Sequence, residues 1–315
     1  MTRKLHIAAA QMGGVHLSDT REQAVARLRA LLAQAHARGV KFVVFPELAL
    51  TTFFPRKWYD DQAEVDTRFF ERDMPSAVTQ PLFDDARRYG IGFYLGYAEL
   101  TQEAGVTRRF NTAILVSPAG AIVGKYRKVH LPGHADFKPQ AAFQHLEKKY
   151  FEIGDLGFQA WRSQDAIIGM LICNDRRWPE AFRALTLQGA ELITLGFNTP
   201  TENLHYPEPP ALRVHHHLIM AQAMAFMNAT WLVETAKCGF EDGNRMFGHS
   251  VIVAPTGEIV AKSASEDDEL ISVEADLDLA QNLKKTMFNY AAHRRPEHYR
   301  ILIDRVGAEV TPANG

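Results

Sequence analysis

The sequence predicts an α/β sandwich, in which two β-sheets pack face to face under helices. Two observations predict this fold. Short apolar runs typical of strands alternate with segments of helical periodicity. In addition, ILVSPAGAIVGK (Ile114 to Lys125) and VIVAPTGEIVAK (Val251 to Lys262) are identical at six of twelve aligned positions. Each predicts a strand, a Pro-x-Gly turn and a second strand, so we expect two related β-hairpins in one pseudo-symmetric domain, although coincidental hairpin chemistry would give the same pattern.

The chain is expected to begin with a strand and a helix. Leu5 to Ala10 is the strand candidate, and Ser18 or Asp19 can cap the helix, with Glu22 completing a capping box. Gly39 ends this helix. Its apolar positions recur at helical spacing: Ala24, Leu28, Leu31, Leu32 and Ala35.

Three apolar strand candidates end at polar residues. Phe42 to Phe45, followed by Pro46, ends at Glu47, Ala166 to Ile172 ends at Cys173, and Glu191 to Leu195 ends near Asn198. A helix between the last two opens at Pro179 and Glu180 and closes at Gly189. In α/β folds, functional groups gather at strand ends, so these positions are candidate site residues.

Two segments depart from this alternation. Thr201 to Pro210, TENLHYPEPP, is polar and rich in proline, as expected for a surface loop over a site. Residues 281–315 form a C-terminal arm, which from about Asp304 has little to bury and is either flexible or held by a neighbouring subunit. We therefore expect one domain over residues 1–315 that includes this arm.

Composition excludes several classes of function. The net charge is −2 and no basic stripe occurs, which disfavours a nucleic-acid partner. The longest apolar runs fall far short of the roughly 18 residues that a membrane span needs. The N-terminal apolar run is too brief for a signal peptide, and we expect a cytoplasmic protein that does not bind membranes.

Cysteines and histidines give no sign of a metal site or a disulfide framework. The chain has two cysteines and 13 histidines, without HExxH or Cys/His ligand spacing. His215, His216 and His217 point in three directions on a helix, which favours packing or an interface over a metal. We expect neither metal nor organic cofactor.

Cys173 is the candidate nucleophile. A lone free cysteine on an apolar strand is more often inert filler. Here the strand ends at the thiol, and Asn174, Asp175, Arg176 and Arg177 follow at once. Backbone N–H groups and positive charge at such a junction are expected to lower the pKa of the thiol below about 8.5. Cys238 lacks such surroundings, and we interpret it as structural.

Glu47 and Lys128 are candidate catalytic residues only in combination with Cys173. Each alone would more often be a solvated surface residue. The ordered motifs FPE, YRKxHL and GxxICND resemble the nitrilase superfamily, whose members use a Glu-Lys-Cys triad at these motifs. Both hairpins look like elements of the same family, and the resemblance runs from about Lys4 to Asp278. It implies a four-layer αββα sandwich and a homodimer or homotetramer, with His215 to Met224 and the arm as candidate interface segments.

Longer stretches are similar to N-carbamoyl-D-amino acid amidohydrolases within that family. They are FPELALTTFFPR, RKVHLPGH, QHLEKKYFEIGDLGF, CNDRRWPE and the segment Ala292 to Pro296. By this resemblance Glu147 is a second glutamate close to Lys128, and the residues expected to line the substrate pocket are Asn174, His130, His145 and Asn198. A hydrogen-bonded structural role for His130 and His145 stays equally open.

The resemblance implies hydrolysis of N-carbamoyl-D-amino acids, small-molecule substrates, to D-amino acids, ammonia and carbon dioxide. Glu47 acts as base, Lys128 stabilises the oxyanion, and the order in which the two carbon–nitrogen bonds break stays open. Arg176 and Arg177 are predicted to clamp the substrate's α-carboxylate, although a solvated arginine pair is the simpler interpretation. Alternatives are β-ureidopropionase or carboxamide amidase activity, a non-enzymatic member of the fold, and a metal-dependent hydantoinase-like hydrolase.

Overall fold

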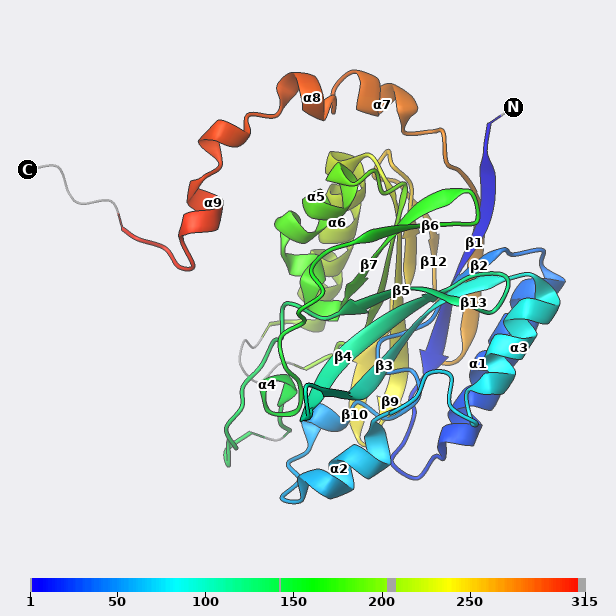
Figure 1. Ribbon diagram of the computed structural model, residues 1–315, viewed down its shortest axis with the longest axis vertical. Coiled ribbons are helices and arrows are strands. Elements are labelled where there is room, and N and C mark those ends of the chain that lie inside the picture. The colour runs from blue at the N-terminus through cyan, green and yellow to red at the C-terminus, as the bar shows by residue number, and fades with distance from the viewer. Residues whose placement is uncertain (1, 142, 203–207, 311–315) are drawn as a thin grey trace, which may run out of the picture.

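The computed structural model describes residues 2–141, 143–202 and 208–310, and it places two β-sheets between two layers of helices (Figure 1). One sheet has the order β5-β4-β3-β2-β1-β13 and the other the order β6-β7-β8-β9-β11-β12. Met12 and Gly13 of β1 pair with Lys237 and Cys238 of β9, which joins the two sheets. The predicted four-layer αββα sandwich is confirmed.

Parallel and antiparallel pairs are mixed in both sheets. The first sheet contains β1 (Lys4–Gly13), β2 (Phe42–Val44), β3 (Gly92–Glu103), β4 (Val106–Val116), β5 (Ile122–Arg127) and β13 (Glu269–Asp276). The second contains β6 (Ala160–Ser163), β7 (Ala166–Ile172), β8 (Leu192–Phe197), β9 (Trp231–Glu241), β11 (Val251–Val253) and β12 (Ile259–Lys262), and β10 (Asn244–Phe247) extends β9 as a hairpin. The strands predicted at Leu5, Phe42, Ala166 and Glu191 are all present, with ends shifted by a few residues.

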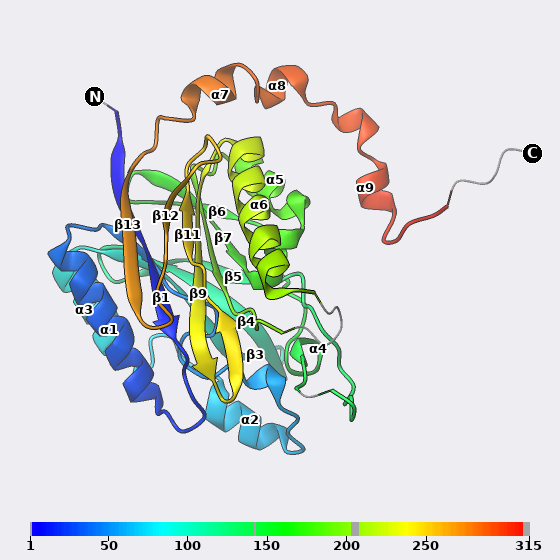
Figure 2. The same cartoon turned by 180° about the vertical axis from the view of Figure 1, so that it is seen from behind.

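Helices cover the outer face of each sheet, as Figure 2 shows from behind. The first sheet carries α1 (Arg21–Ala37) and α3 (Gln80–Tyr89), and the second carries α5 (Pro179–Leu187) and α6 (Pro210–Asn228). Short helices connect the layers or follow strands: η1 (Phe54–Arg56), α2 (Gln62–Phe69), α4 (Glu147–Tyr150) and η2 (Cys173–Arg177). The arm contains α7 (Gln281–Lys285), α8 (Tyr290–His293), η3 (Pro296–His298) and α9 (Ile301–Asp304), which form an arc beside α5 and α6 (Figure 1).

The two hairpins predicted from the repeat are related in detail. In one, Ile114 pairs with Lys125, and in the other Val251 pairs with Lys262 at the equivalent place. Each hairpin has a register shift one residue further along, after Leu115 and after Ile252. The glycine of each Pro-x-Gly turn has a positive φ, +73° and +85°, which explains why glycine occupies both turns.

The cap of α1 differs from the prediction. Thr20 is the N-cap, and its hydroxyl accepts from the backbone N–H of Gln23 while the Gln23 side chain accepts from the backbone N–H of Thr20. Neither Ser18 nor Asp19 caps the helix, and Glu22 does not complete the box. Asp19 is already engaged because its carboxylate accepts from the backbone N–H of His16 and closes the preceding turn.

Three further expectations concern the surface of the molecule. Residues 203–207 of the loop predicted at Thr201 to Pro210 lie outside the described residues. Within the described part of the arm, the apolar side chains of Leu302 and Ile303 are 62% and 79% exposed. Across the described ranges, no helix combines the length and apolarity needed to cross a membrane.

Tyr94 of β3 ties the two sheets together close to the strand that ends at Cys173. The ring is fully buried, and its hydroxyl donates to the backbone oxygen of Leu171 at 3.0 Å. The same hydroxyl accepts from the backbone N–H of Gly196 at 3.2 Å. One side chain of the first sheet therefore contacts β7 and β8 of the second, beside their carboxyl ends.

Replacing Tyr94 by Phe should lower the free energy of unfolding by about 1–3 kcal/mol, because buried backbone groups lose their partner. Urea denaturation measures this change. The matched control is Tyr89→Phe, since the Tyr89 hydroxyl contacts only a surface guanidinium in the described structure, that of Arg88, and should cost less than about 0.5 kcal/mol. Equal losses in both variants would show that the hydroxyl of Tyr94 does not join the sheets.

Candidate active site

Four candidate residues meet because each follows the end of a strand. Glu47 follows β2, Lys128 follows β5, Cys173 follows β7 and Asn198 follows β8. The first two belong to one sheet and the last two to the other, so the site lies between the sheets. Glu47 and Lys128 are completely buried, whereas Cys173 and Asn198 are 5% and 4% exposed.

The backbone at Glu47 is enclosed by a glycine from each sheet. A Cβ atom on Gly96 of β3 would lie 2.8 Å from the Cα of Glu47, and one on Gly196 of β8 would lie 2.5 Å from its backbone nitrogen. Only a residue without a side chain allows such an approach. These two glycines therefore let the sheets close upon Glu47.

Lys128 lies between two carboxylates. Its Nζ is 2.7 Å from Oε1 of Glu47 and 2.6 Å from Oε2 of Glu147, and all three side chains are fully buried. Asn111 donates to Oε1 of Glu47 at 2.8 Å, and the backbone N–H of Asn198 donates to Oε2 at 2.9 Å. Both oxygens of Glu47 are thus held, which fixes the carboxylate in one orientation.

The two carboxyl groups differ in basicity. Burial raises the pKa of Glu47, and the nearby Glu147 raises it further against the opposing charge of Lys128. Burial also disfavours ionisation of Glu147, but Lys128 and a contact from His145 outweigh it, and its pKa is lowered. Glu47 is therefore the better proton acceptor of the two.

Lys128 keeps its proton in this site. Burial alone would lower the pKa of Lys128, but the negative charge that Cys173 gains when it ionises, together with the charges of Glu147 and Glu47, reverses the effect and raises it. A permanently charged ammonium group suits Lys128 to stabilise a developing oxyanion and not to act as a base.

The pKa of the Cys173 thiol differs in direction from the expectation based on the sequence. Burial raises its pKa to about 12, and Glu47 adds to the increase, whereas Lys128 and Arg176 oppose it. The expected decrease below about 8.5 is wrong because the strand ends inside the sandwich and not at its surface. The resting thiol is protonated, so attack requires simultaneous transfer of the proton to a base such as Glu47.

The backbone of Cys173 has an unusual conformation. It has a left-handed φ of +46° at the first position of η2, a conformation that non-glycine residues rarely adopt. Its Sγ lies 3.8 Å from the backbone oxygen of Asn198. Cys238, by contrast, is buried with its Sγ 3.4 Å from the backbone oxygens of Met12 and Asp267, as expected for a structural cysteine.

His130 and Asn174 lie beside Cys173 and contact each other. Nδ1 of His130 is 2.8 Å from Asp175, and its ring stacks on Trp178 with centroids 4.9 Å apart. Asn174 donates to the backbone oxygen of His130 and accepts from Arg177, both at 3.0 Å. Both residues are partly exposed, and their polar groups are engaged with neighbours on the same wall of the site.

His145 and Asn198 contact the two glutamates. Nε2 of His145 is 3.3 Å from Oε1 of Glu147, and its ring meets the edge of Phe53. The side chain of Asn198 donates to the backbone oxygen of Glu47 at 2.8 Å. Each therefore fixes a glutamate, while a direct contact with substrate remains a prediction.

The two predicted clamp arginines have different environments. Arg176 is 2% exposed, lies over the ring of Phe197 and donates to Thr199 at 2.8 Å, while its Nε and Nη1 have no hydrogen-bond partner among the described residues. Arg177 is exposed and donates to Asn174. Both line a cavity of about 360 Å³ that also contacts Thr199 and Phe247.

Several residues that position the site were given no role from the sequence. They are Asn111, which positions Glu47; Asp175, which accepts from Tyr126 and from the backbone of Ile172 and His130; and the glycines Gly96 and Gly196. The backbone oxygen of Asn111 also accepts from the N–H of Lys128, a contact between neighbouring strands that no local sequence pattern signals. Within the described ranges, no group of three or more His, Cys, Asp or Glu side chains is arranged so that it could hold a metal ion.

Comparison with known proteins gives consistent results. Residues 6–285 match the family model described as carbon-nitrogen hydrolase. An N-carbamoylputrescine amidase of Arabidopsis thaliana is 30% identical, with 92% of this chain and 93% of the relative covered. A citrullinase of Francisella tularensis is 26% identical over 91% of this chain and 94% of the relative. A carbon-nitrogen hydrolase from Helicobacter pylori shares the fold with a TM-score of 0.80 at 23% identity, covering 96% of this chain and 99% of that one.

Glu147→Gln should move the acidic limb of the kcat/KM profile to lower pH. In the native protein, loss of activity with falling pH should begin above the ordinary glutamate range, because the base Glu47 has a raised pKa. The Glu147 charge contributes to that increase, so removing it lowers the pKa of Glu47 and preserves the carboxylate form at lower pH. kcat should fall as well.

Rates measured from about pH 4 to 9 give the midpoint of that limb. Glu152→Gln is the matched control, because Glu152 is a carboxylate outside the site that pairs with Arg108, and the midpoint should not move. If the midpoint of the acidic limb is the same in Glu147→Gln as in the native protein, Glu47 is not the group whose ionisation limits the rate.

Proposed function

This chain belongs to the carbon-nitrogen hydrolase family, and from that membership we propose that it hydrolyses N-carbamoyl-D-amino acids to D-amino acids, ammonia and carbon dioxide. The observation that carries the proposal is the buried Arg176, whose Nε and Nη1 lack partners in the described structure and which lines a cavity of about 360 Å³ together with Arg177. Only three positions separate it from the nucleophile on η2. A planar guanidinium with free donors matches a carboxylate.

The charge of the cavity favours this substrate over the one named for a relative. N-carbamoylputrescine, the substrate in the name of the Arabidopsis relative, carries an ammonium group away from its ureido group. The cavity instead presents Arg176, Arg177 and Arg213. Like charges in a confined site repel, so an anionic N-carbamoyl compound fits better than a cationic one.

The first half of the reaction uses Glu47, Cys173 and Lys128. Glu47 takes the thiol proton as sulfur attacks the ureido carbonyl, which puts negative charge on the carbonyl oxygen. Lys128 and the backbone N–H after Cys173 stabilise that charge, and a donor of this kind contributes about 3 to 4 kcal/mol. Glu47 then returns the proton to the leaving nitrogen, and ammonia departs.

The second half releases the amino acid. Glu47 activates water against the thiocarbamate that links the substrate to Cys173, and the thiol leaves as it regains a proton. The product is a carbamate, which loses carbon dioxide and takes up a proton to give the amino acid. Glu147 keeps Lys128 charged and aligned through the 2.6 Å contact during both halves.

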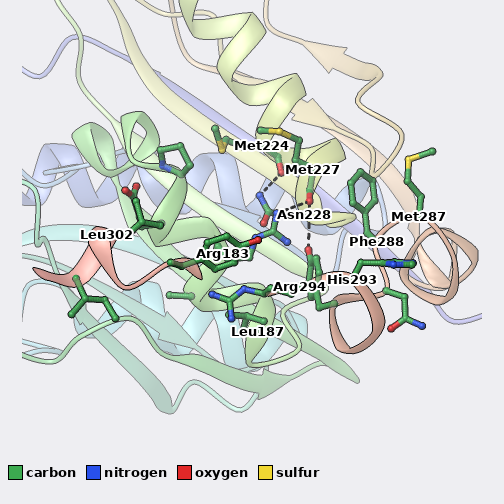
Figure 3. A pocket seen from close by; sticks show the side chains of 17 residues that line it. Arg183, Leu187, Met224, Met227, Asn228, Met287, Phe288, His293, Arg294 and Leu302 are labelled. Carbon is green, nitrogen blue, oxygen red and sulfur yellow. Dashed lines mark hydrogen bonds between the residues drawn. The ribbon is translucent and has the colours of Figure 1, made fainter. Parts of the chain in front are cut away.

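We also propose that the protein is a homodimer or homotetramer. α6 exposes Leu212 and Ile219 next to His215, and the arm exposes Leu302 and Ile303. A cavity of about 660 Å³ lies between α5, α6 and the arm, and Figure 3 shows Leu187, Met224 and Met227 around it together with Met287, Phe288 and Leu302. Exposed apolar side chains at such density favour burial against another subunit.

Deleting residues 281–315 should reduce the molar mass in solution. Light scattering after size-exclusion chromatography should give a molar mass that is a multiple of 35.4 kDa for the full chain. For the shortened chain, the molar mass divided by its own subunit mass should give fewer subunits. The double variant Leu302→Ser/Ile303→Ser tests the apolar contact with the arm retained. A full-length protein of one subunit's mass would contradict the assembly.

Arg176→Gln should lower kcat/KM for N-carbamoyl-D-amino acids by about 10- to 100-fold, because a charge-assisted hydrogen bond is lost. The loss should be small for an N-alkylurea, which lacks the carboxylate. Arg177→Gln is the matched control and should have the smaller effect, since Arg177 is exposed and engaged with Asn174.

The same assays test the substrate class. The amine product is measured for each substrate: the free amino acid for N-carbamoyl-D- and L-amino acids and N-carbamoyl-β-alanine, and putrescine for N-carbamoylputrescine. Ammonia is measured for a simple carboxamide. We expect the D-amino acid derivatives to react fastest. Preference for N-carbamoyl-β-alanine or for a simple carboxamide would favour those activities instead, and equal losses on charged and uncharged substrates would give Arg176 a purely structural role.

A further inference from the structure

The cavity lined by Arg176 and Arg177 of η2, the short helix that begins at Cys173, contains more positive charge than an α-carboxylate needs. Arg176 and Arg177 reach it from η2, and Arg213 reaches it from α6. Within the described residues that line it, Glu208 is the only carboxylate. Three guanidinium groups therefore surround about 360 Å³ of space with one compensating anion.

Arg213 is fixed in place by its neighbours. Its Nε is 3.1 Å from Oε1 of Glu208, and its Nη1 donates to the backbone oxygens of Pro200 at 2.7 Å and Thr201 at 3.1 Å. The residue is only 8% exposed. Burial lowers the pKa of Arg213, Glu208 opposes the decrease, and the positive charge of Arg176 contributes to it. The last effect indicates that the two guanidinium groups are close enough to repel each other.

The histidines of the cavity do not change this balance. His216 lines the cavity, is about half exposed, and has its Nδ1 3.1 Å from Oε2 of Glu208. Nδ1 of His217 lies 3.2 Å from Oε2 of Glu234, and both side chains are buried. Glu234 is not among the described residues that line the cavity, so its carboxylate does not face the ligand alongside the three guanidinium groups.

The net charge of the residues that line the cavity indicates how many negative charges a well-matched ligand carries. Three arginines and Glu208 leave a net charge of +2, and one α-carboxylate would neutralise only half of it. Uncompensated like charges in a partly buried cavity are unfavourable, so a ligand with two carboxylates is favoured over one with a single carboxylate.

We propose that the preferred substrates are N-carbamoyl derivatives of the acidic D-amino acids, with the α-carboxylate on Arg176 and the side-chain carboxylate on Arg213. This inference rests on the proposed function, which it makes more specific. Met220 and Phe247 line the same cavity and offer apolar surface to the methylene groups between the two carboxylates. A volume of about 360 Å³ suits a molecule of this size.

The test compares N-carbamoyl-D-glutamate with N-carbamoyl-D-glutamine, which has the same shape without the second charge. Release of the free amino acid is measured, because an amidase could also release ammonia from the glutamine side chain. The ratio of kcat/KM for glutamate to that for glutamine should be at least about 10 at low ionic strength, and it should fall as salt is added.

Variants that remove a charge from the cavity should change the ratio of kcat/KM for N-carbamoyl-D-glutamate to that for N-carbamoyl-D-glutamine, each in a predictable direction. Arg213→Gln removes the proposed partner and leaves Glu208 to repel the substrate, so the ratio should fall by at least about 10-fold. Glu208→Gln removes the anion and should raise the ratio. In the double variant the ratio should lie between those of Arg213→Gln and the native protein.

General damage to the fold cannot produce this order, because it would slow both substrates together and leave the ratio unchanged. A native ratio at or below one, or a ratio that is the same in all four proteins, overturns the assignment to acidic side chains while turnover of other N-carbamoyl-D-amino acids keeps the proposed function. Absence of turnover for every N-carbamoyl-D-amino acid would overturn both.

Discussion

The ammonium group of Lys128, enclosed between the carboxylates of Glu47 and Glu147, determines the chemistry of the site. All three groups are withdrawn from water, and removing one partner of a buried ion pair typically costs about 3–5 kcal/mol. The two carboxylates contribute to keeping the lysine charged. Lys128 lowers the pKa of both carboxyl groups, but His145 lowers that of Glu147 further and the charge of Glu147 raises that of Glu47, so that Glu47 can accept a proton while Glu147 remains an anion. The tight closure of the sheets over Gly96 and Gly196 maintains this separation from solvent.

Much of the fold and the triad could be predicted because their signals are local. An apolar strand that ends at Glu47 or Cys173 identifies both the strand and the position of its functional residue, and a repeated hairpin is visible as a repeated string. The roles of Asn111 and Gly196 depend on contacts between distant strands, which no local pattern contains. The pKa of Cys173 was predicted in the wrong direction for the same reason, since burial is a property of the packed sandwich and not of the neighbouring residues.

The proposed recognition of the substrate depends on two segments that are far apart in the sequence. Arg176 lies three positions after Cys173 on η2, and its proximity to the site could be inferred from the sequence. Arg213 belongs to α6 and approaches the cavity only because Glu208 and the backbone oxygens of Pro200 and Thr201 hold it there. In the proposed function, the catalytic groups thus follow strand ends of both sheets, whereas Arg213 comes from the helical layer outside one of them.

A crystal structure of Cys173→Ala with bound N-carbamoyl-D-glutamate would test this account most directly, because it places the scissile group and both carboxylates in one observation. We predict the ureido carbonyl oxygen within hydrogen-bond distance of Lys128 Nζ, its carbon beside position 173, and the α-carboxylate on Nε and Nη1 of Arg176. A ureido group bound away from Lys128, or an α-carboxylate that contacts none of the arginines of the cavity, would contradict it.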